Sequence, residues 1–472
     1  MQVTFDDGSI EQYADHPFAG GKEGDVFLSF DGRSVVKLYR PDSSQNEIRK
    51  IRLETLMKEH NPTTKDSYWS RFLAWPEKLV IAPRIGFRMR YIGKMKSLGH
   101  YTFPKTYNRL PPEDKGWFIG HIASAIHLVN VARLFSTMGL CYPDFSHKNI
   151  MIEPFSGNMV LIDCDSLTHK DRSDKLPPTV QGTSWYRAPE LVSGREKYPS
   201  VKTDRHALAV ILYYWLLARH PLIGDRPPHS EDADRDDELT LGQEALYIEH
   251  PTDLSNRAAK QTLKASALGP ELENLFRKAF VEGLHYPDKR PLPYQWLEAL
   301  RRTYDRIIPC ESKDCDWHFF VVTPTSRLTC PRCLSTLLYP EVLPFLYLLK
   351  HRGSSYDNDY NLDTTRSHYV VGWPGRTLHQ WHIISDATPM HSSKASQDMK
   401  EKLLFEFEPT TSTWYLKNLA LPELVYSQRG DRVSTWQPCP VGSCILLIHS
   451  MLLQFGQGPE HYRASIHLQE IG

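Results

Sequence analysis

The spacing of apolar positions changes along the chain and separates stretches of different predicted structure. Within residues 1 to 40, short apolar runs flank Asp7-Gly8 and Asp31-Gly32, which is typical of hairpins. Residues 45 to 60 carry apolar side chains at helical spacing and predict an amphipathic helix. Residues 79 to 92 predict a strand pair. The chain therefore opens with a β-rich segment.

Helical patterning dominates the next part of the chain. Strand-like runs interrupt it at 149 to 153 and 159 to 163, and helices return at 270 to 307. The longest apolar run, 207 to 218, has 12 residues, which is too short to span a bilayer and predicts a buried core helix. Residues 223 to 240 are acidic and contain proline, so we expect a surface loop.

The composition changes twice towards the end of the chain. Residues 306 to 338 carry four cysteines, and residues 365 to 472 contain short strand candidates separated by turn residues. This second pattern favours a small β-sandwich. The stretch 339 to 364 ends in a polar segment and is predicted to be a linker.

Overall composition excludes several classes of protein. Apolar residues make up 40% and charged residues 24% of the 472 positions, as in globular proteins of more than one domain. Basic and acidic residues both number 56, so no net charge attracts nucleic acid or an anionic membrane. The first residues lack the pattern of a secretory signal. We therefore expect a cytoplasmic protein that binds neither nucleic acid nor membrane.

A glycine-rich stretch, Ala19 to Val26, follows the first strands. Gly21 and Gly24 would let backbone amides approach phosphates, and Val26 would cover a nucleotide base. The first glycine of the nucleotide-loop pattern falls on Ala19, so the match is partial. An ordinary turn between strands is the alternative.

Lys37 lies in the next strand, 11 residues after Val26. A lysine there can reach the α- and β-phosphates of ATP if a helix carboxylate orients it. Glu47 and Glu54, seven residues apart on one predicted helix, are the candidates. The alternative is a solvated charge at a strand edge.

Asp144, Asn149 and Asp163 form the third chemical pattern. Phosphoryl transfer needs a carboxylate that deprotonates the attacking hydroxyl and oxygen ligands for Mg²⁺. An Asp, an Asn five residues later and a strand that ends in Asp supply these groups.

The stretch 182 to 190, Gly-Thr-Ser-Trp-Tyr-Arg-Ala-Pro-Glu, resembles the end of a protein-kinase activation segment. Asp204 heads a stretch similar to the start of the long buried helix of the kinase C-lobe. Arg290 resembles the late arginine that kinases pair with the glutamate of this segment, here Glu190. The resemblance covers about residues 10 to 305.

The resemblance implies a role for each residue of the three patterns. Asp144 is the catalytic base, and Asn149 and Asp163 bind Mg²⁺, with Asp165 as the alternative metal ligand. Glu47 orients Lys37, with Glu54 as the second choice. The backbone of residues 90 to 92 meets adenine. The residues assigned to ATP are Gly21, Gly24, Val26, Lys37, Glu47, Met89 and Tyr91.

Three departures from the kinase pattern concern regulation. The usual H-R-D is Tyr142-Pro143-Asp144, so the arginine that receives an activation-loop phosphate is missing. The lysine two residues after the base is Ser146, which leaves Lys148 as a substitute. D-F-G is Asp163-Cys164-Asp165. We therefore expect control through attached domains or partners.

The motifs K-L-Y-x-P, A-W-P, G-F-x-M and I-D-x-D-S resemble one bacterial branch of the family. Its kinases are encoded beside a PP2C-type phosphatase and a TerY-like von Willebrand factor A protein, and are linked to tellurite resistance and stress. The resemblance implies these two proteins as partners.

The cysteine cluster has the spacing of a zinc ribbon. Cys310 and Cys315 are separated by four residues, Cys330 and Cys333 by two, and 14 residues lie between the pairs. Four thiolates bind zinc tetrahedrally and leave no open position for catalysis, so we predict a structural Zn²⁺. Cys439 and Cys444 are expected to be ordinary cysteines of the β-rich region.

The C-terminal region is distantly similar to forkhead-associated phosphothreonine-binding domains. Gly375-Arg376 would grip a phosphate, or Arg376 would be a surface arginine. Trp381 and Trp414 are expected to lie in the core.

The sequence therefore predicts an ATP- and magnesium-dependent protein serine/threonine kinase, because small-molecule kinases of this fold usually lack the A-P-E segment. The alternative is a pseudokinase scaffold or phosphopeptide-binding adaptor. The fold class is α+β, in the order of an N-lobe (1–92), a C-lobe (93–305), a zinc ribbon (306–338), a linker (339–364) and a β-sandwich (365–472).

Overall fold

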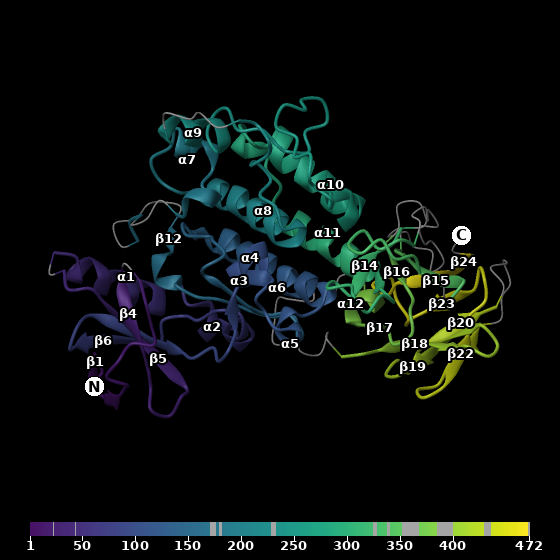
Figure 1. The fold of residues 1–472 in the computed structure, drawn as a ribbon. Helices are drawn as coiled ribbons and strands as arrows, with labels where there is room; N and C mark the ends of the chain where they lie inside the picture. Colours follow the sequence, from purple (N-terminus) through teal and green to yellow (C-terminus); the bar gives the residue numbers. More distant parts are fainter. Residues whose placement is uncertain are drawn as a thin grey trace. The chain divides into compact units, whose positions relative to one another are not determined.

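The computed structural model (Figure 1) describes most of the chain. The described residues are 1–21, 23–42, 44–169, 176–178, 182–227, 233–323, 328–337, 340–351, 368–384, 400–428 and 436–470. They fall into two compact units. The first comprises 1–116, 120–265 and 273–297, and the second comprises 117–119, 266–272 and 298–472.

The first unit opens with a seven-stranded antiparallel sheet in the order β2-β1-β6-β7-β5-β4-β3. Both predicted hairpins and the predicted strand pair lie in it. Its strands are β1 (Gln2–Phe5), β2 (Ile10–Gln12), β3 (Ala19–Gly20), β4 (Gly24–Leu28), β5 (Ser34–Tyr39), β6 (Lys78–Ala82) and β7 (Gly86–Arg90). The predicted helix is α1 (Asn46–Lys58).

Strand β5 divides its side chains between two apolar clusters. Val35 and Tyr39 pack in the cluster that contains Leu53 of α1, whereas Val36 and Leu38 pack in the other. Because successive side chains of a strand point to opposite faces, Lys37 lies on the face that α1 covers.

The helical part of the first unit is built on the buried helix α8 (Val201–Leu217), the core helix predicted from the apolar run. Ser200 and Thr203 cap its first turn reciprocally, a capping box. Trp215 Nε1 of α8 donates to His121 Nδ1 at 3.0 Å, which joins α8 to α6 (Phe118–Met138).

Among the described residues, one stretch, Pro112–Met138, is long and apolar enough to cross a membrane, and 67% of its most apolar window is buried in the fold. Core helices of folded proteins pass the same test, so this finding is weak support for a membrane span.

Further helices in the described part of residues 62–305 are short or lie near the end of the helical part. They are α2 (Pro62–Lys65), α3 (Gly99–Thr102), α4 (Pro104–Tyr107), α5 (Pro112–Lys115), α7 (Pro189–Val192), α9 (Ala233–Thr240), α10 (Pro270–Arg277) and α11 (Pro293–Asp305). The prediction of a loop over 223–240 is wrong for residues 233–240, which form α9.

Small strands flank the segment of the first unit that contains Asp144, Asn149 and Asp163. β10 (Ile150–Glu153) pairs with β11 (Asn158–Leu161) and with β8 (Lys96–Ser97). β9 (Leu140–Cys141) pairs with β12 (Thr168–His169). These pairs place the residues that follow β9 and β11 near each other.

The second unit contains a strand pair and two larger antiparallel sheets. β13 (Ile307–Pro309) pairs with β14 (Phe319–Val321). The six-stranded sheet has the order β16-β15-β24-β23-β20-β21, and the four-stranded sheet β17-β18-β19-β22. Their strands are β15 (Val342–Leu349), β16 (His368–Val371), β17 (Thr377–Leu378), β18 (Leu403–Glu408), β19 (Thr413–Asn418), β20 (Val425–Ser427), β21 (Gln437–Pro438), β22 (Cys444–Leu446), β23 (Leu452–Gln454) and β24 (Arg463–Glu470).

Three sequence predictions for this region are corrected. Residues 342–349, assigned to a linker, form β15, and seven of its eight residues are buried. Residues 377–384, one of the strand candidates in the sequence, begin with the short strand β17 and continue as the helix α12 (Gln380–Ile383). The apolar run 444–455 contains β22 and β23, which belong to different sheets. Both sheets contribute to one apolar core, which includes Trp414 as predicted.

Candidate active site

Asp144 lies in the loop after β9, and its carboxylate has partners on both oxygens. Asn149 Nδ2 donates to Oδ2 at 2.9 Å. The backbone N–H of Thr183 and its hydroxyl donate to Oδ1 at 3.1 and 2.8 Å. The segment that ends in Ala-Pro-Glu therefore fixes the candidate base. The sequence analysis quoted Thr183 within a motif but assigned it no role.

The loop that carries Asp144 is anchored to α8 by Asp204. The backbone N–H of Tyr142 donates to Asp204 Oδ2 at 2.8 Å, and Cys141 Sγ donates to Oδ1 at 3.2 Å. Burial raises the pKa of Asp204 to about 7. The Tyr142 hydroxyl donates to the carbonyl of Ile162 at 2.6 Å, so this tyrosine joins the loop to the residue before Asp163.

Asp163 and Asp165 follow β11 and both contact Lys37. Lys37 Nζ forms an ion pair with Asp163 and lies 3.0 Å from Asp165 Oδ2. Asp163 has a left-handed backbone with φ 61°. Burial, together with the charge of Asp165, raises the pKa of Asp163 to about 6, although Lys37 opposes the shift.

The predicted pairing of Lys37 with a carboxylate of α1 is wrong. The third carboxylate near Lys37 Nζ belongs to Glu23, at 3.8 Å, whereas Glu47 is exposed and Glu54 pairs with Lys58 at 3.7 Å. The reason is helical register. The buried face of α1 is centred on Arg52 and Leu56, and Glu47 lies about 140° from Arg52 around the helix axis.

Arg52 takes the inward position on α1 that the glutamates lack. It is buried, and its guanidinium donates to the carbonyl of Leu167 at 2.7 Å and to that of Pro177. Both carbonyls belong to the segment after Asp165. Arg52 is a further residue that the sequence analysis missed, since nothing in the helical pattern separates it from the neighbouring surface arginines.

Some of the residues predicted to bind the nucleotide lie near Lys37. Val26 lies opposite Lys37 in the β4–β5 ladder, and Val26, Met89 and Tyr91 pack in or against the cluster that contains Val35. A Cβ on Gly24 would lie 2.5 Å from the carbonyl of Leu38, so the close approach of β5 explains this glycine. Gly21 closes the turn through a 2.9 Å bond from its N–H to the carbonyl of Gly24.

The residue in place of the missing kinase lysine and the predicted substitute for that lysine differ in burial. Ser146, which stands in its position, is fully buried. Lys148 is exposed beside Asn149. Lys22, in the glycine-rich turn, lies outside the described residues.

Glu190 and Arg290 form the predicted ion pair. Both nitrogens of the guanidinium fork donate to the carboxylate at 2.7 Å, and both side chains are buried. Arg290 also donates to the carbonyls of Gly283 at 2.9 Å and Leu284 at 3.0 Å. The pair therefore fixes the start of α7 to the loop before α11.

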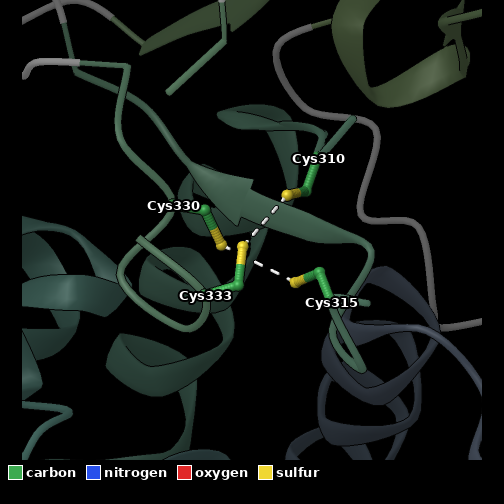
Figure 2. Close-up of side chains that lie close together, drawn as sticks. All are labelled: Cys310, Cys315, Cys330 and Cys333. Carbon is green, nitrogen blue, oxygen red and sulfur yellow. Dashed lines mark hydrogen bonds between the residues drawn. The ribbon is translucent and has the colours of Figure 1, made fainter. Parts of the chain in front are cut away.

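The four cysteines of the predicted ribbon converge (Figure 2). Their sulfur atoms all lie within 4.8 Å of one another. Cys310 Sγ lies 3.5 Å from Cys333 Sγ, and Cys315 Sγ lies 3.8 Å from Cys330 Sγ. These distances exceed a disulfide bond of ~2.05 Å. They match the ~3.8 Å between thiolates arranged tetrahedrally ~2.3 Å from a metal. The group could therefore hold a metal ion.

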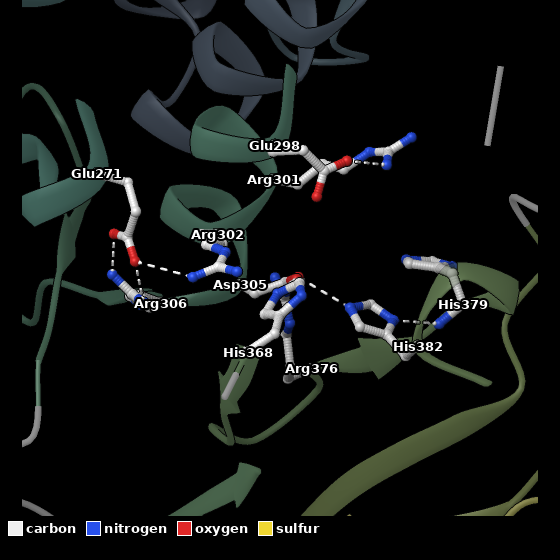
Figure 3. Close-up of polar contacts among 10 residues, drawn as sticks. All are labelled: Glu271, Glu298, Arg301, Arg302, Asp305, Arg306, His368, Arg376, His379 and His382. Carbon is white, nitrogen blue, oxygen red and sulfur yellow. Dashed lines mark hydrogen bonds and ion pairs between the residues drawn. The ribbon is translucent and has the colours of Figure 1, made fainter. Parts of the chain in front are cut away.

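Arg376 is not a phosphate ligand at the surface. It is buried, and its guanidinium donates to Asp305 Oδ1 at 2.7 Å. Figure 3 shows Asp305 at the centre of this cluster, with contacts to His382 Nε2 at 2.9 Å and His368 Nε2 at 2.6 Å. Burial opposes ionisation of Asp305, but the two histidines hold its pKa well below the usual range. The cluster is a structural joint of the second unit.

Comparison with known proteins agrees with the geometry. Residues 115–280 match the protein kinase domain family, a range that contains Asp144, Asn149, Asp163 and Glu190. This match supports a phosphotransferase, and it implies ATP and Mg²⁺ as the cofactors of that reaction.

One relative is "Fatty acyl-CoA synthetase and RNA processing-associated kinase 1" of Saccharomyces cerevisiae, which is 25% identical over 211 residues. The alignment covers 44% of this chain and 22% of the relative, so the chain spans about a fifth of the length of that protein. The two comparisons together support kinase activity.

Proposed function

We propose that the chain is an ATP- and Mg²⁺-dependent protein serine/threonine kinase. The observation that carries the proposal is the assembled state of the catalytic groups. Asn149 and Thr183 hold the carboxylate of Asp144, and Lys37 is paired with Asp163. The matched kinase domain supports the class of reaction.

The proposed reaction moves one phosphoryl group. The carboxylate of Asp144 accepts the proton of a serine or threonine hydroxyl while the hydroxyl oxygen attacks the γ-phosphorus. The bond from that phosphorus to the β–γ bridging oxygen breaks, and ADP leaves. Lys37 would hold the α- and β-phosphates. The amide nitrogen of Asn149 faces Asp144, which leaves its oxygen, with the half-exposed carboxylate of Asp163, as ligands of the kind that Mg²⁺ prefers.

The Ala-Pro-Glu segment supports proteins as the substrates. The segment ends at Glu190, which forms a buried ion pair with Arg290. The test is incubation of the purified chain with Mg-ATP and a generic protein substrate, followed by analysis of the labelled amino acids. Phosphoserine or phosphothreonine is expected. Label on tyrosine alone would contradict the serine/threonine assignment, and the absence of label would favour the pseudokinase scaffold.

The thiol cluster supports a second proposal, a structural Zn²⁺ site. The four sulfur atoms lie within 4.8 Å of one another, and four thiolate ligands on one zinc would leave no coordination position for substrate. Metal analysis of the purified chain is expected to find about one zinc per chain. A folded chain without metal would contradict the proposal.

The motif resemblance supports a bacterial stress-response role, with a TerY-like protein and a PP2C-type phosphatase as partners in the cytoplasm. Two of these motifs are in contact, since the Tyr39 hydroxyl donates to Asp165 Oδ2 at 2.6 Å. Binding of the purified chain to each partner tests the proposal, and absence of binding to both would overturn it.

We propose that residues 365–472 are similar to forkhead-associated domains in fold only, because Arg376, the predicted phosphate ligand, is buried.

A further inference from the structure

Lys37 has an unusual set of partners for a protein kinase. Kinases orient the strand lysine with a glutamate of the following helix, but the glutamates of α1 do not contact it here. Instead, Asp165, which stands at the glycine position of D-F-G, lies 3.0 and 3.2 Å from Lys37 Nζ through its two oxygens.

We propose that Asp165 is the positioning residue that orients Lys37, and that the Tyr39 hydroxyl holds Asp165 in place. The inference rests on the proposed kinase function, which it deepens. The anchor of the phosphate-binding lysine thus comes from the turn after β11 and from β5 itself. Helix α1 contributes no carboxylate to it.

The geometry of β5 brings these groups together. Lys37 and Tyr39 are two residues apart on one strand and therefore point to the same face. The Tyr39 hydroxyl donates to Asp165 Oδ2 at 2.6 Å, and Lys37 Nζ contacts both oxygens of the same carboxylate. A buried carboxylate needs such compensation, because an unpaired charge in the interior is strongly unfavourable.

Asp163 and Asp165 differ in solvent exposure, and this difference indicates different roles for the two carboxylates. The side chain of Asp165 is 3% exposed, whereas that of Asp163 is 30% exposed. A magnesium ion usually keeps several waters when it binds protein carboxylates. Asp163 has the open side that such an ion requires, and Asp165 does not. Asp165 therefore acts as a positioning residue and not as a metal ligand.

Helix α1 has a different connection to the site. Its inward Arg52 donates to the carbonyls of Leu167 and Pro177. A displacement of α1 would therefore act on the segment after Asp165, while the contact between Lys37 and Asp165 joins β5 to the turn after β11 without a side chain of α1.

Three variants test the inference: Asp165→Asn, Tyr39→Phe and, as the matched helix variant, Glu47→Gln. Asp165→Asn is expected to weaken Mg-ADP binding and raise the KM for ATP on the order of tenfold, the typical effect of losing a hydrogen bond to a charged group. Tyr39→Phe is expected to act in the same direction with a smaller change. Glu47→Gln should stay within about twofold of wild type, since the inference gives that side chain no contact with Lys37.

Magnesium dependence separates positioning from metal binding. Asp163→Asn is expected to raise the Mg²⁺ concentration needed for half-maximal activity, whereas Asp165→Asn should keep the wild-type dependence. Two results would overturn the inference: a loss in Glu47→Gln as large as in Asp165→Asn, or the same Mg²⁺ shift in both aspartate variants.

Calorimetric Mg-ADP binding needs no phosphoryl transfer, so it tests the inference even if wild type proves inactive. In that case the kinase proposal fails and the Lys37 assignment is judged by binding alone. Thermal unfolding of each variant accompanies the binding data. If Asp165→Asn does not fold, Tyr39→Phe, which keeps the carboxylate, decides: unchanged Mg-ADP binding and KM in that variant would overturn the inference.

Discussion

Asp204 accepts a hydrogen bond from the backbone N–H of Tyr142 at 2.8 Å, which joins the buried helix α8 to the loop that carries Asp144. The position of this loop is thereby tied to a helix in the core of the first unit. The tyrosine of Tyr-Pro-Asp strengthens the joint, because its hydroxyl bonds to the carbonyl of Ile162, one residue before Asp163.

The burial of Asp204 predicts a pH-dependent stability. Its pKa is raised from 3.8 to about 7, so the folded state prefers the protonated form. Its contribution to the free energy of unfolding is full below pH ~4 and is lost as the pH rises through ~7, by on the order of 4 kcal/mol in total. Urea unfolding at several pH values should show a smaller decline between pH 5 and 8 in Asp204→Asn. An identical decline in both proteins would contradict this.

The pair of Glu190 and Arg290 is predicted to be essential for stability. Arg290→Ala leaves a buried carboxylate unpaired and should lower the free energy of unfolding by about 3–5 kcal/mol. Lys202 and Asp288 provide a matched control, since they form an exposed pair at 2.7 Å. Asp288→Ala should leave the urea midpoint unchanged. An equal decrease in the free energy of unfolding in the two variants would contradict the stabilising role of the buried Glu190–Arg290 pair.

The four-cysteine cluster is predicted to stabilise the chain only when it holds a metal ion. Cys330→Ser should lose the bound zinc and lower the melting temperature of the purified protein, and a strong chelator should do the same to wild type. Cys444, which is exposed and outside the cluster, is the control, and Cys444→Ser should retain both. Retention of zinc by Cys330→Ser would contradict the four-thiolate site.

The Asp305 cluster predicts a structural role for Arg376. Arg376→Ala should lower the free energy of unfolding by several kcal/mol, because it removes a partner from a buried carboxylate. The depressed pKa of Asp305 means that its contribution is present above pH ~4 and is lost as the pH falls further. Thermal unfolding at neutral pH measures the first effect. A fully stable variant that loses phosphopeptide binding would restore the phosphate-ligand hypothesis.

The grouping of the candidate residues followed from the sequence because the kinase motifs are short and local. Asn149 contacts Asp144 at 2.9 Å, and the strands β10 and β11, which precede or follow these residues, overlap the apolar runs at 149 to 153 and 159 to 163. The order of the motifs alone predicts the ion pair between Glu190 and Arg290, which are 100 positions apart in the sequence.

The failures have physical causes that a single sequence does not display. The partner of Lys37 depended on which face of α1 is buried, and both glutamates lay outside that face. Strand β15 contains a proline, Pro344, and precedes a polar stretch, which favoured a linker, yet it pairs along its whole length with β24. Arg376 was placed at the surface because its buried partner, Asp305, lies 71 positions earlier.

Asp144 and Asp163 are the two residues that we propose to carry phosphoryl transfer in this chain. The direct test is radiolabelled phosphate transfer from ATP by wild type, Asp144→Asn and Asp163→Asn, compared at equal concentrations of folded protein. We expect label from wild type and a loss of at least about a hundredfold in each variant, the usual scale for a catalytic acid or base. Label from wild type that persists unchanged in both variants would contradict it.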